Sequence, residues 1–152
     1  MSNQTADIKN SISRYLSMRE HSRKELIDKL SKKYFEMDLI LQCIDEFSTK
    51  NLQSDDRYTE SFVRSKYNNH KGPNFISASL KSKGVSESII DNVLSSYNEE
   101  DWQLIAIAAL EKKTIYRNIE PAKSKIKQKI FLSGRGFSYK TIEHALNEYW
   151  KK

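Results

Sequence analysis

The segment Met18–Leu26, MREHSRKEL, brings together the residue types that acid–base chemistry uses. It holds one of the three histidines of the chain, a serine, two glutamates and three basic residues. A histidine beside a serine and a carboxylate can transfer protons, and paired arginines can bind phosphate or carboxylate groups. However, Ser22 precedes Glu25 by three residues, and this S-x-x-E spacing before an apolar face is typical of a capping box. The spacing predicts a helix start, gives His21 no proton-transfer role and leaves Arg19 and Arg23 unexplained.

The other reactive residues form no catalytic or metal-binding pattern. The histidines fall in different parts of the chain, with no pair at i, i+4 and no H-E-x-x-H sequence. Cys43 falls on the apolar face of a predicted helix, which favours a core residue over a nucleophile. The triplet Gly134-Arg135-Gly136 resembles a phosphate loop only superficially and is interpreted as a turn, because neither glycine-rich phosphate motif is present. We therefore predict a protein that is not an enzyme and has no cofactor and no metal.

An internal repeat predicts the elements that position these residues. The windows 30–47, 80–97 and 132–149 align without gaps at periods of 50 and 52 residues, and six apolar or aromatic positions agree in all three. Ile40, Ile90 and Ile142 are each followed by apolar residues at spacings of 3, 4 and 7, which is one face of an α-helix. The third repeat begins with a further helical pattern formed by Leu104, Ile105, Ala108 and Ala109. We predict an all-α protein of three tandem three-helix repeats, 1–50, 51–98 and 99–152, stacked into an elongated, curved array.

Turn residues recur at the helix boundaries of the repeat. Gly84 and Gly136 are placed to end the middle helices in the left-handed conformation, whereas Tyr34 occupies that turn without a glycine. Ser86 and Ser138 follow as predicted N-caps of the third helices. Proline opens the middle helix of the last two repeats, at Pro73 directly after Gly72 and at Pro121.

The net charge of +6 resides entirely in the last third of the chain. Residues 101–152 carry 11 basic and 5 acidic side chains, whereas the two preceding segments of 50 residues carry +1 and −1. Between Lys112 and Lys140 a single acid, Glu120, accompanies nine basic residues: Lys112, Lys113, Arg117, Lys123, Lys125, Lys127, Lys129, Arg135 and Lys140. Such density favours a nucleic acid or an acidic protein surface as partner over a merely solvated face.

The alternating lysines of this segment are interpreted as part of a helix. Pro121 and the repeat register favour a helix over a strand. We expect Ile126 and Ile130 to point inward, with Lys123 and Lys127 on one flank. Lys125 and Lys129 then line the other flank.

Four segments together carry a family resemblance: YLSMREHSRKELIDKL (15–30), LQSDDRYTESFVRSKY (52–67), HKGPNFISASLKSKGV (70–85) and FLSGRGFSYKTIEHAL (131–146). They resemble the RecX family, regulators of the RecA recombinase, and the resemblance spans nearly the whole chain. It implies tandem three-helix repeats and a non-enzymatic protein that binds RecA–DNA filaments, lies along the filament groove and usually limits RecA activity in DNA repair and recombination. It also implies a role in the SOS response.

Individual motif positions carry over by residue. The first motif is matched by Arg19, Glu20, His21, Ser22, Arg23 and Leu26, the second by Lys71, Gly72, Pro73 and Ile76, and the third by Arg135, Gly136 and Phe137. Two positions depart from the family, because Tyr34 and Asn51 stand where glycine is usual. The candidate contacts with RecA or DNA are Arg19, Arg23, Arg64, Lys71, Lys81, Lys83, Lys123, Lys125, Lys127, Lys129 and Arg135. The structural motif residues are Ser22, Glu25, Leu26, Gly72, Pro73, Gly84 and Gly136.

Composition also bounds the cellular setting. The N-terminal residues do not form a signal peptide, no apolar run approaches the length of a membrane span, and a single cysteine excludes an intramolecular disulfide. We expect a cytoplasmic monomer that has no membrane partner. Two alternatives remain, a stand-alone helix-turn-helix-like DNA-binding protein and a protein–protein scaffold whose charge is solubilising.

Overall fold

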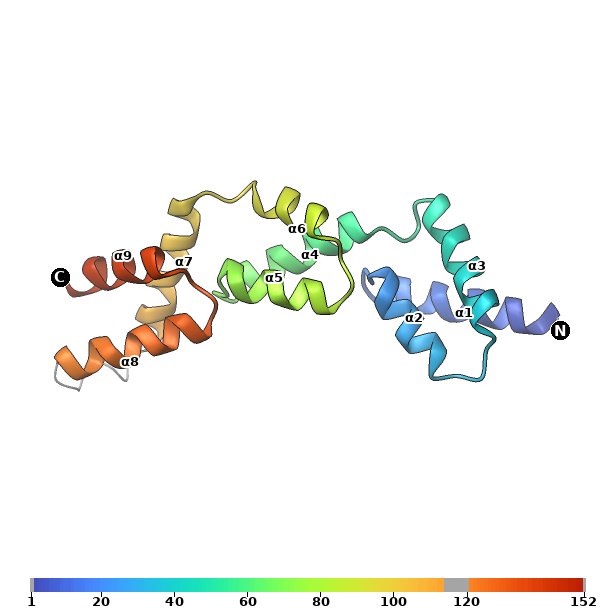
Figure 1. Cartoon of the computed structure of the whole chain (residues 1–152), viewed down its shortest axis with the longest axis horizontal. Helices are drawn as coiled ribbons and strands as arrows, with labels where there is room; N and C mark the ends of the chain where they lie inside the picture. Colours follow the sequence, from blue (N-terminus) through green and yellow to red (C-terminus); the bar gives the residue numbers. More distant parts are fainter. Residues whose placement is uncertain (1, 114–120, 152) are drawn as a thin grey trace. The chain divides into compact units, whose positions relative to one another are not determined.

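The computed structural model describes residues 2–113 and 121–151, and these residues form nine α-helices and no strand (Figure 1). The helices are α1 (Ser2–Met18), α2 (Arg23–Ser31), α3 (Met37–Thr49), α4 (Asp55–Asn68), α5 (Pro73–Ser82), α6 (Glu87–Leu94), α7 (Glu99–Lys112), α8 (Pro121–Gly134) and α9 (Tyr139–Trp150). They fall in threes at the positions of the repeat, so the predicted all-α fold of tandem three-helix repeats is confirmed. Arg117 and Glu120 of the basic segment lie outside the described residues.

The chain divides into two compact units. One comprises Met1–Ser61 with Leu80–Ile90, and the other comprises Phe62–Ser79 with Asp91–Lys152. Among the described residues, every helix is too short or too polar to traverse a lipid bilayer.

The core of the first repeat follows the predicted apolar pattern. Ile8 and Ile12 of α1, Leu26 and Leu30 of α2, and Ile40, Cys43 and Ile44 of α3 pack as one buried cluster. α3 contacts both α1 and α2. Full burial of each aliphatic side chain contributes about 1.5–3 kcal/mol. The prediction that Cys43 is a core residue is confirmed, and burial raises the pKa of its thiol.

The helix ends use left-handed residues in the way the sequence predicts, and at two further positions. Gly84 and Gly136 have φ of +78° and +97°, and Asn51 and His70 have φ of +59° and +60°. After α5, the Gly84 N–H donates to the Lys81 carbonyl and the next N–H donates to the Leu80 carbonyl, which is a Schellman motif. Equivalent bonds follow α3, α4 and α8. Tyr34 is absent from the residues with positive φ, so the first repeat makes this turn differently.

The buried face of α8 differs from the prediction. Ile126 and Ile130 are 61% and 69% exposed, so the expectation that they point inward is wrong. The side chains of Ser124, Gln128 and Leu132, at i, i+4 and i+8, are fully buried instead. By the repeat period, Gln128 occupies the position of Leu26 and Ile76. The third repeat thus buries the same repeat positions as the other two but carries polar residues on the inner face of this helix.

The first helix of the third repeat shows a smaller difference of the same kind. Leu104 is 66% exposed, whereas Trp102, Ile105, Ala106, Ala109 and Leu110 are buried. In this repeat α9 contacts both α7 and α8 (Figure 1).

Candidate functional site

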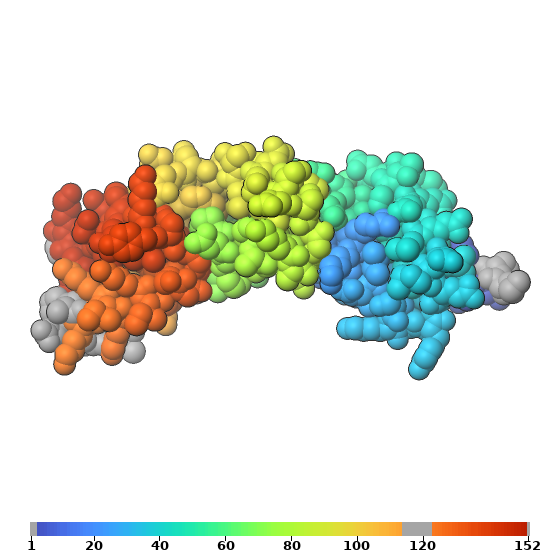
Figure 2. Space-filling view, viewed as in Figure 1, coloured from blue at the N-terminus to red at the C-terminus, as the bar shows by residue number. Residues whose placement is uncertain are grey.

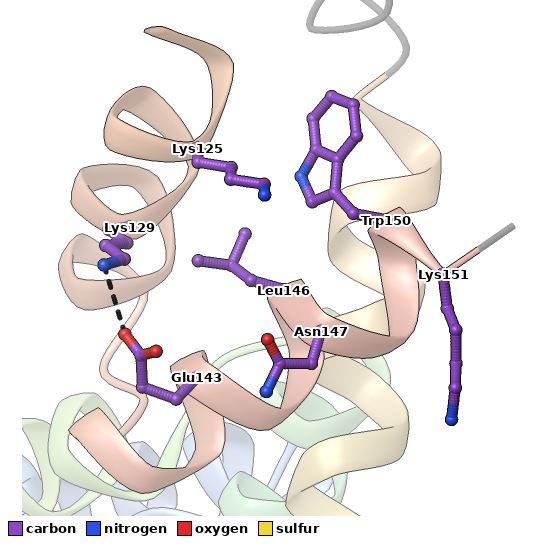
Figure 3. A pocket seen from close by; sticks show the side chains of 7 residues that line it. All are labelled: Lys125, Lys129, Glu143, Leu146, Asn147, Trp150 and Lys151. Atoms are coloured by element: carbon purple, nitrogen blue, oxygen red, sulfur yellow. Dashed lines mark ion pairs between the residues drawn. The ribbon is translucent and has the colours of Figure 1, made fainter. Parts of the chain in front are cut away.

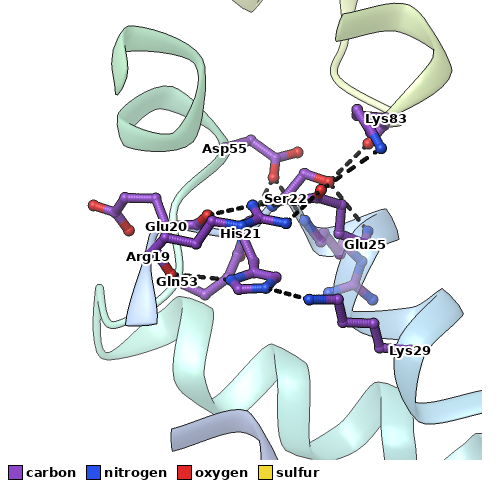
Figure 4. A network of polar contacts seen from close by, with 10 residues as sticks. Arg19, Glu20, His21, Ser22, Glu25, Lys29, Gln53, Asp55 and Lys83 are labelled. Atoms are coloured by element: carbon purple, nitrogen blue, oxygen red, sulfur yellow. Dashed lines mark hydrogen bonds and ion pairs between the residues drawn. The ribbon is translucent and has the colours of Figure 1, made fainter. Parts of the chain in front are cut away.

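The capping box predicted at the start of α2 is confirmed. The Ser22 hydroxyl accepts a hydrogen bond from the Glu25 N–H at 3.1 Å, and the Glu25 carboxylate accepts one from the Ser22 N–H at 3.1 Å. The Ser22 hydroxyl also donates to the carbonyl oxygen of Lys83 at 2.8 Å (Figure 4). Ser22 therefore stabilises both the helix start and a long-range contact.

The two arginines beside this cap have partners within the chain. Arg19 donates to both carboxylate oxygens of Glu25 at 3.1 Å, and Arg23 lies 2.5 Å from an oxygen of Asp45. The capping box alone left Arg19 and Arg23 unexplained, and these contacts give both of them a role within the chain. Their side chains remain 50% and 37% exposed, so a partner can still reach them.

Glu25 is the electrostatic centre of this cluster. Its side chain is 9% exposed, and the Lys83 ammonium lies 3.8 Å from its second oxygen. Burial raises the pKa of Glu25, but the hydrogen bonds from Arg19 and Ser22 outweigh this effect and bring the pKa below its usual value. Glu25 is therefore a buried anion that forms ion pairs with Arg19 and Lys83.

His21 is a structural residue. It is 1% exposed, with Nδ1 lying 3.0 Å from the Arg19 carbonyl oxygen and Nε2 lying 2.8 Å from the Lys29 amine (Figure 4). Burial is the main cause that lowers its pKa. A neutral ring that donates to the carbonyl and accepts from Lys29 satisfies both contacts. The described residues contain no group of three His, Cys, Asp or Glu side chains arranged to hold a metal ion.

The second and third sequence motifs contact each other. The Arg135 guanidinium donates to the carbonyl oxygens of His70, at 2.9 Å, and Asn69. The Gly72 N–H donates to the Arg135 carbonyl at 2.7 Å, and the Asn74 N–H donates to the Gly136 carbonyl at 3.0 Å. This pairing supports the interpretation of Gly134-Arg135-Gly136 as a turn and gives Arg135 a structural role that its sequence pattern does not indicate.

Close backbone approach explains the glycines of these motifs. A Cβ atom on Gly72 would lie 2.4 Å from the Gly136 carbonyl carbon. A Cβ atom on Gly136 would lie 2.4 Å from the Phe75 backbone nitrogen. Gly136 also needs its positive φ. The motif glycines are therefore structural.

The lysines of α8 lie on the protein surface. Lys123, Lys125, Lys127 and Lys129 are all exposed, and Figure 2 shows side chains of this segment, in orange, on the molecular surface. Lys129 lies 3.2 Å from Glu143, and the Lys125 ammonium lies 5.7 Å from the centre of a Trp150 ring (Figure 3). With Ser124, Gln128 and Leu132 facing inward, the four lysines lie on two flanks of α8, as predicted. Ile126 and Ile130 lie between these flanks and face outward.

The remaining candidate contacts are dispersed. Arg64 and Lys81 are exposed on α4 and α5. Lys71 lies with its ammonium 4.5 Å from the centre of the Phe75 ring. Lys71 and Arg135 also line a pocket of about 540 Å³ together with Asn69, His70, Ala109, Lys112, Lys113 and Phe131. Three residues that line this pocket, Lys112, Lys113 and His70, are not among the contacts predicted from the sequence. The run of basic residues that begins at Lys112 is the sequence signal that could have identified the two lysines.

These features define the class of protein as a tandem three-helix repeat protein with an electropositive third repeat. The family models for the first and second three-helix domains of RecX match residues 9–47 and 54–94. The chain belongs to the RecX family, which confirms the resemblance seen in the sequence.

Individual relatives extend this similarity over the whole chain. The chain is 32% identical to the regulatory protein RecX of Chromohalobacter salexigens over 151 residues, which is 99% of this chain and 98% of that protein. It is 35% identical to the regulatory protein RecX of Legionella pneumophila (strain Corby) over 136 residues, or 89% of each chain. The crystal structure of RecX from Lactobacillus salivarius matches with a TM-score of 0.87 and 28% identity, covering all of both chains.

Proposed function

We propose that this protein is a non-enzymatic regulator that binds RecA–DNA filaments and limits the recombinase and ATPase activities of RecA. Membership of the RecX family over nearly the full chain length carries this proposal. In it, a cytoplasmic monomer acts through three repeats with boundaries at 1–50, 51–98 and 99–152. The setting is DNA repair and recombination, including the SOS response.

The outward face of α8 supports contact with protein as well as with DNA. Ile126 and Ile130 are exposed one helical turn apart, and lysines lie on both sides of them. Burying an aliphatic side chain contributes about 1.5–3 kcal/mol, but only against another apolar surface, which a phosphate backbone does not offer. An acidic protein surface with an apolar centre fits this face, and RecA within the filament is the proposed source.

The ion pairs within the chain rank the candidate contacts. Arg19, Arg23 and Arg135 already bind partners inside the protein, so their loss also affects the fold. Four other candidates are exposed and form no ion pair in the described part of the chain, so a partner can reach them more easily than the three arginines. They are Arg64, Lys81, Lys123 and Lys127. Lys71, Lys83, Lys125 and Lys129 fall between the two groups.

A RecA assay tests this function directly. The DNA-dependent ATPase activity of RecA and the length of its filaments are measured with and without an equimolar amount of this protein. We expect both to decrease. The quadruple variant Lys123→Glu, Lys125→Glu, Lys127→Glu and Lys129→Glu should lose most of this effect. Unchanged ATPase activity and filament length with the wild-type protein would contradict the proposal.

Stand-alone DNA binding is the second candidate. The helix pair α5–α6, joined through the left-handed Gly84, resembles a helix-turn-helix. A gel-shift series without RecA separates the two functions. Tight, sequence-dependent binding to duplex DNA at physiological salt would favour this alternative over filament regulation.

A further inference from the structure

A concave electropositive site lies where the ends of three helices meet in the C-terminal unit. The pocket of about 540 Å³ is lined by residues that follow α4, by the end of α7 and by the C-terminal part of α8. Its cationic residues are Lys71, Lys112, Lys113 and Arg135, and His70 lies among them. Among the described residues, no aspartate or glutamate lines this pocket, whereas Glu143 lines the pocket beside α9 and Glu25 lines the one beside α2.

Three of the four cations of the pocket lie over aromatic rings, and Arg135 also donates to carbonyl groups. The Lys113 ammonium lies 4.7 Å from the centre of the Phe131 ring, and the Arg135 guanidinium lies 5.5 Å from the same centre. Lys71 lies over Phe75 in the same way. None of the four cations forms an ion pair with an acid of the described chain. No side chain of the described residues therefore neutralises their positive charge in an ion pair.

The helix dipoles do not account for this charge. Each helix C-terminus carries about half a negative charge, so the three ends contribute about −1.5 in total. Against the four cations, about +2.5 remains. The pKa of His70 is lowered by burial and then by the charges of Lys112 and Arg135, and the pKa of Lys71 is lowered by burial and then by Arg135 and Lys66. Both groups therefore experience an excess of positive charge that an anion would relieve.

The remaining donors favour phosphate over carboxylate. A carboxylate is best recognised by the two parallel N–H groups of an arginine. Arg135 already donates from two nitrogens to the carbonyl oxygens of Asn69 and His70. The groups left to bind an anion are the ammonium groups of Lys71, Lys112 and Lys113, which act as point charges, as lysine does when it binds phosphate.

We infer that this pocket binds a phosphate group of a nucleic-acid backbone, with Lys71, Lys112 and Lys113 as the ligands. The inference deepens the proposed function, because it assigns DNA to this pocket and leaves the outward face of α8 for protein. Its test needs no RecA, so failure of the pocket and failure of RecA regulation are distinguishable.

The test uses the 152-residue chain and nuclear magnetic resonance titration of the histidine side chains. The His70 signal is assigned with a His70→Gln variant. The probes are a short single-stranded oligothymidylate, inorganic sulfate as a free tetrahedral anion, and polyglutamate as a carboxylate ligand, all at equal ionic strength. A bound phosphate cancels nearby positive charge, so the oligothymidylate should raise the pKa of His70 and leave His21, in the other unit, unchanged.

Affinity for the oligothymidylate as a function of salt concentration gives an independent readout. The double variant Lys112→Ala and Lys113→Ala should reduce the magnitude of the slope of log affinity against log salt concentration by about 1–2. Each phosphate contact that is lost no longer releases counterions when the DNA binds. The control Lys32→Ala and Lys140→Ala removes the same charge from exposed positions outside the pocket and should leave the slope unchanged.

Three outcomes would overturn the inference. The first is an unchanged pKa of His70 at saturating oligothymidylate. The second is a larger rise with polyglutamate or with sulfate alone, which would make the ligand a carboxylate or a free oxyanion. The third is an equal loss of slope in the two double variants, which would show that only overall charge matters.

Discussion

The guanidinium of Arg19 donates two hydrogen bonds of 3.1 Å to Glu25, one to each carboxylate oxygen. The same carboxylate accepts the Ser22 N–H and so closes the capping box at the start of α2. A single buried acid thus joins the residue expected to contact a partner to the residue that begins a helix. Substitutions in this segment will change the fold and the binding surface together, and they need to be measured separately.

The stability of the protein should depend on the ionisation of Glu25. Its pKa is lower in the folded protein than its usual value of 4.5, so the stabilisation is fully present above pH 4.5 and is lost as the pH falls through the folded value. Glu25→Gln should lower the free energy of unfolding by about 1–2 kcal/mol at pH 7, since Arg19 is half exposed and screening reduces its share. Urea unfolding measures both proteins from pH 7 to pH 3.

The two unfolding curves should converge in acid. The control Glu60→Gln changes an exposed acid on α4 and should not alter the pH dependence. A difference between wild type and Glu25→Gln that stays constant down to pH 3 would contradict the role given to this carboxylate.

The glycines of the Gly134-Arg135-Gly136 turn should respond in opposite ways to alanine. Gly136→Ala places a Cβ 2.4 Å from the Phe75 backbone nitrogen at a φ of +97°. We expect a loss of more than about 2 kcal/mol in unfolding free energy, since a left-handed alanine alone costs about 1–2 kcal/mol. Gly134→Ala meets no atom within 4 Å and ends a helix, so it should be neutral or stabilise by up to about 1 kcal/mol. Equal effects of the two variants would refute the structural role of this turn.

Local signals in the sequence predicted most of the backbone. The S-x-x-E spacing predicted the start of α2, and Gly84 and Gly136 predicted the ends of α5 and α8, because capping and left-handed turns depend on a few neighbouring residues. Asn51 takes the same left-handed turn without glycine.

Capping and turn residues could not predict the tertiary contacts. Asp45, the partner of Arg23, lies 22 residues along the chain and on another helix. On α8 the apolar character of Ile126 and Ile130 suggested the wrong inner face. The repeat period aligned Gln128 with two buried aliphatic residues and was the better guide, because packing geometry repeats even where residue type does not.

Gln128 and Gln53 should differ sharply when each is replaced by leucine. Gln128 is fully buried, and while its Oε1 accepts from Trp150 at 2.8 Å, its Nε2 has no partner in the described chain. Gln128→Leu removes this unsatisfied amide nitrogen and restores the residue type of the equivalent position in the first repeat. It also removes the acceptor of the Trp150 indole N–H, but Trp150 is only partly buried and its N–H can bind water instead. The net result should be a stabilisation of up to about 1 kcal/mol.

Gln53 is the matched comparison because its amide is satisfied on both sides. It accepts from Ser48 at 2.6 Å and donates to the His21 carbonyl and to Asp55. Gln53→Leu leaves these groups unpaired and should cost about 2–4 kcal/mol. Urea unfolding of both variants checks the pair, and a destabilising Gln128→Leu would show that its amide has a role that the described contacts lack.

The exposed isoleucines of α8 should matter for binding and not for folding. In the double variant Ile126→Ser and Ile130→Ser, serine has a helix propensity similar to that of isoleucine, and neither side chain is in the core. The unfolding free energy should therefore change by less than about 1 kcal/mol. If α8 docks on a protein with an apolar centre, affinity for RecA–DNA filaments should fall at least tenfold, since two aliphatic contacts contribute more than about 1.4 kcal/mol.

Leu104→Ser provides the control for this variant. Leu104 is 66% exposed on α7 and is absent from the proposed interface, so its loss should leave filament affinity unchanged. Binding is measured by fluorescence anisotropy on preformed filaments and, separately, on the same DNA without RecA. The double variant should bind free DNA as the wild type does, because the lysines are intact and the phosphate backbone gives isoleucine no apolar contact. If the double variant bound filaments as tightly as wild type, or weakened DNA binding equally, then the outward face of α8 would not be a protein contact.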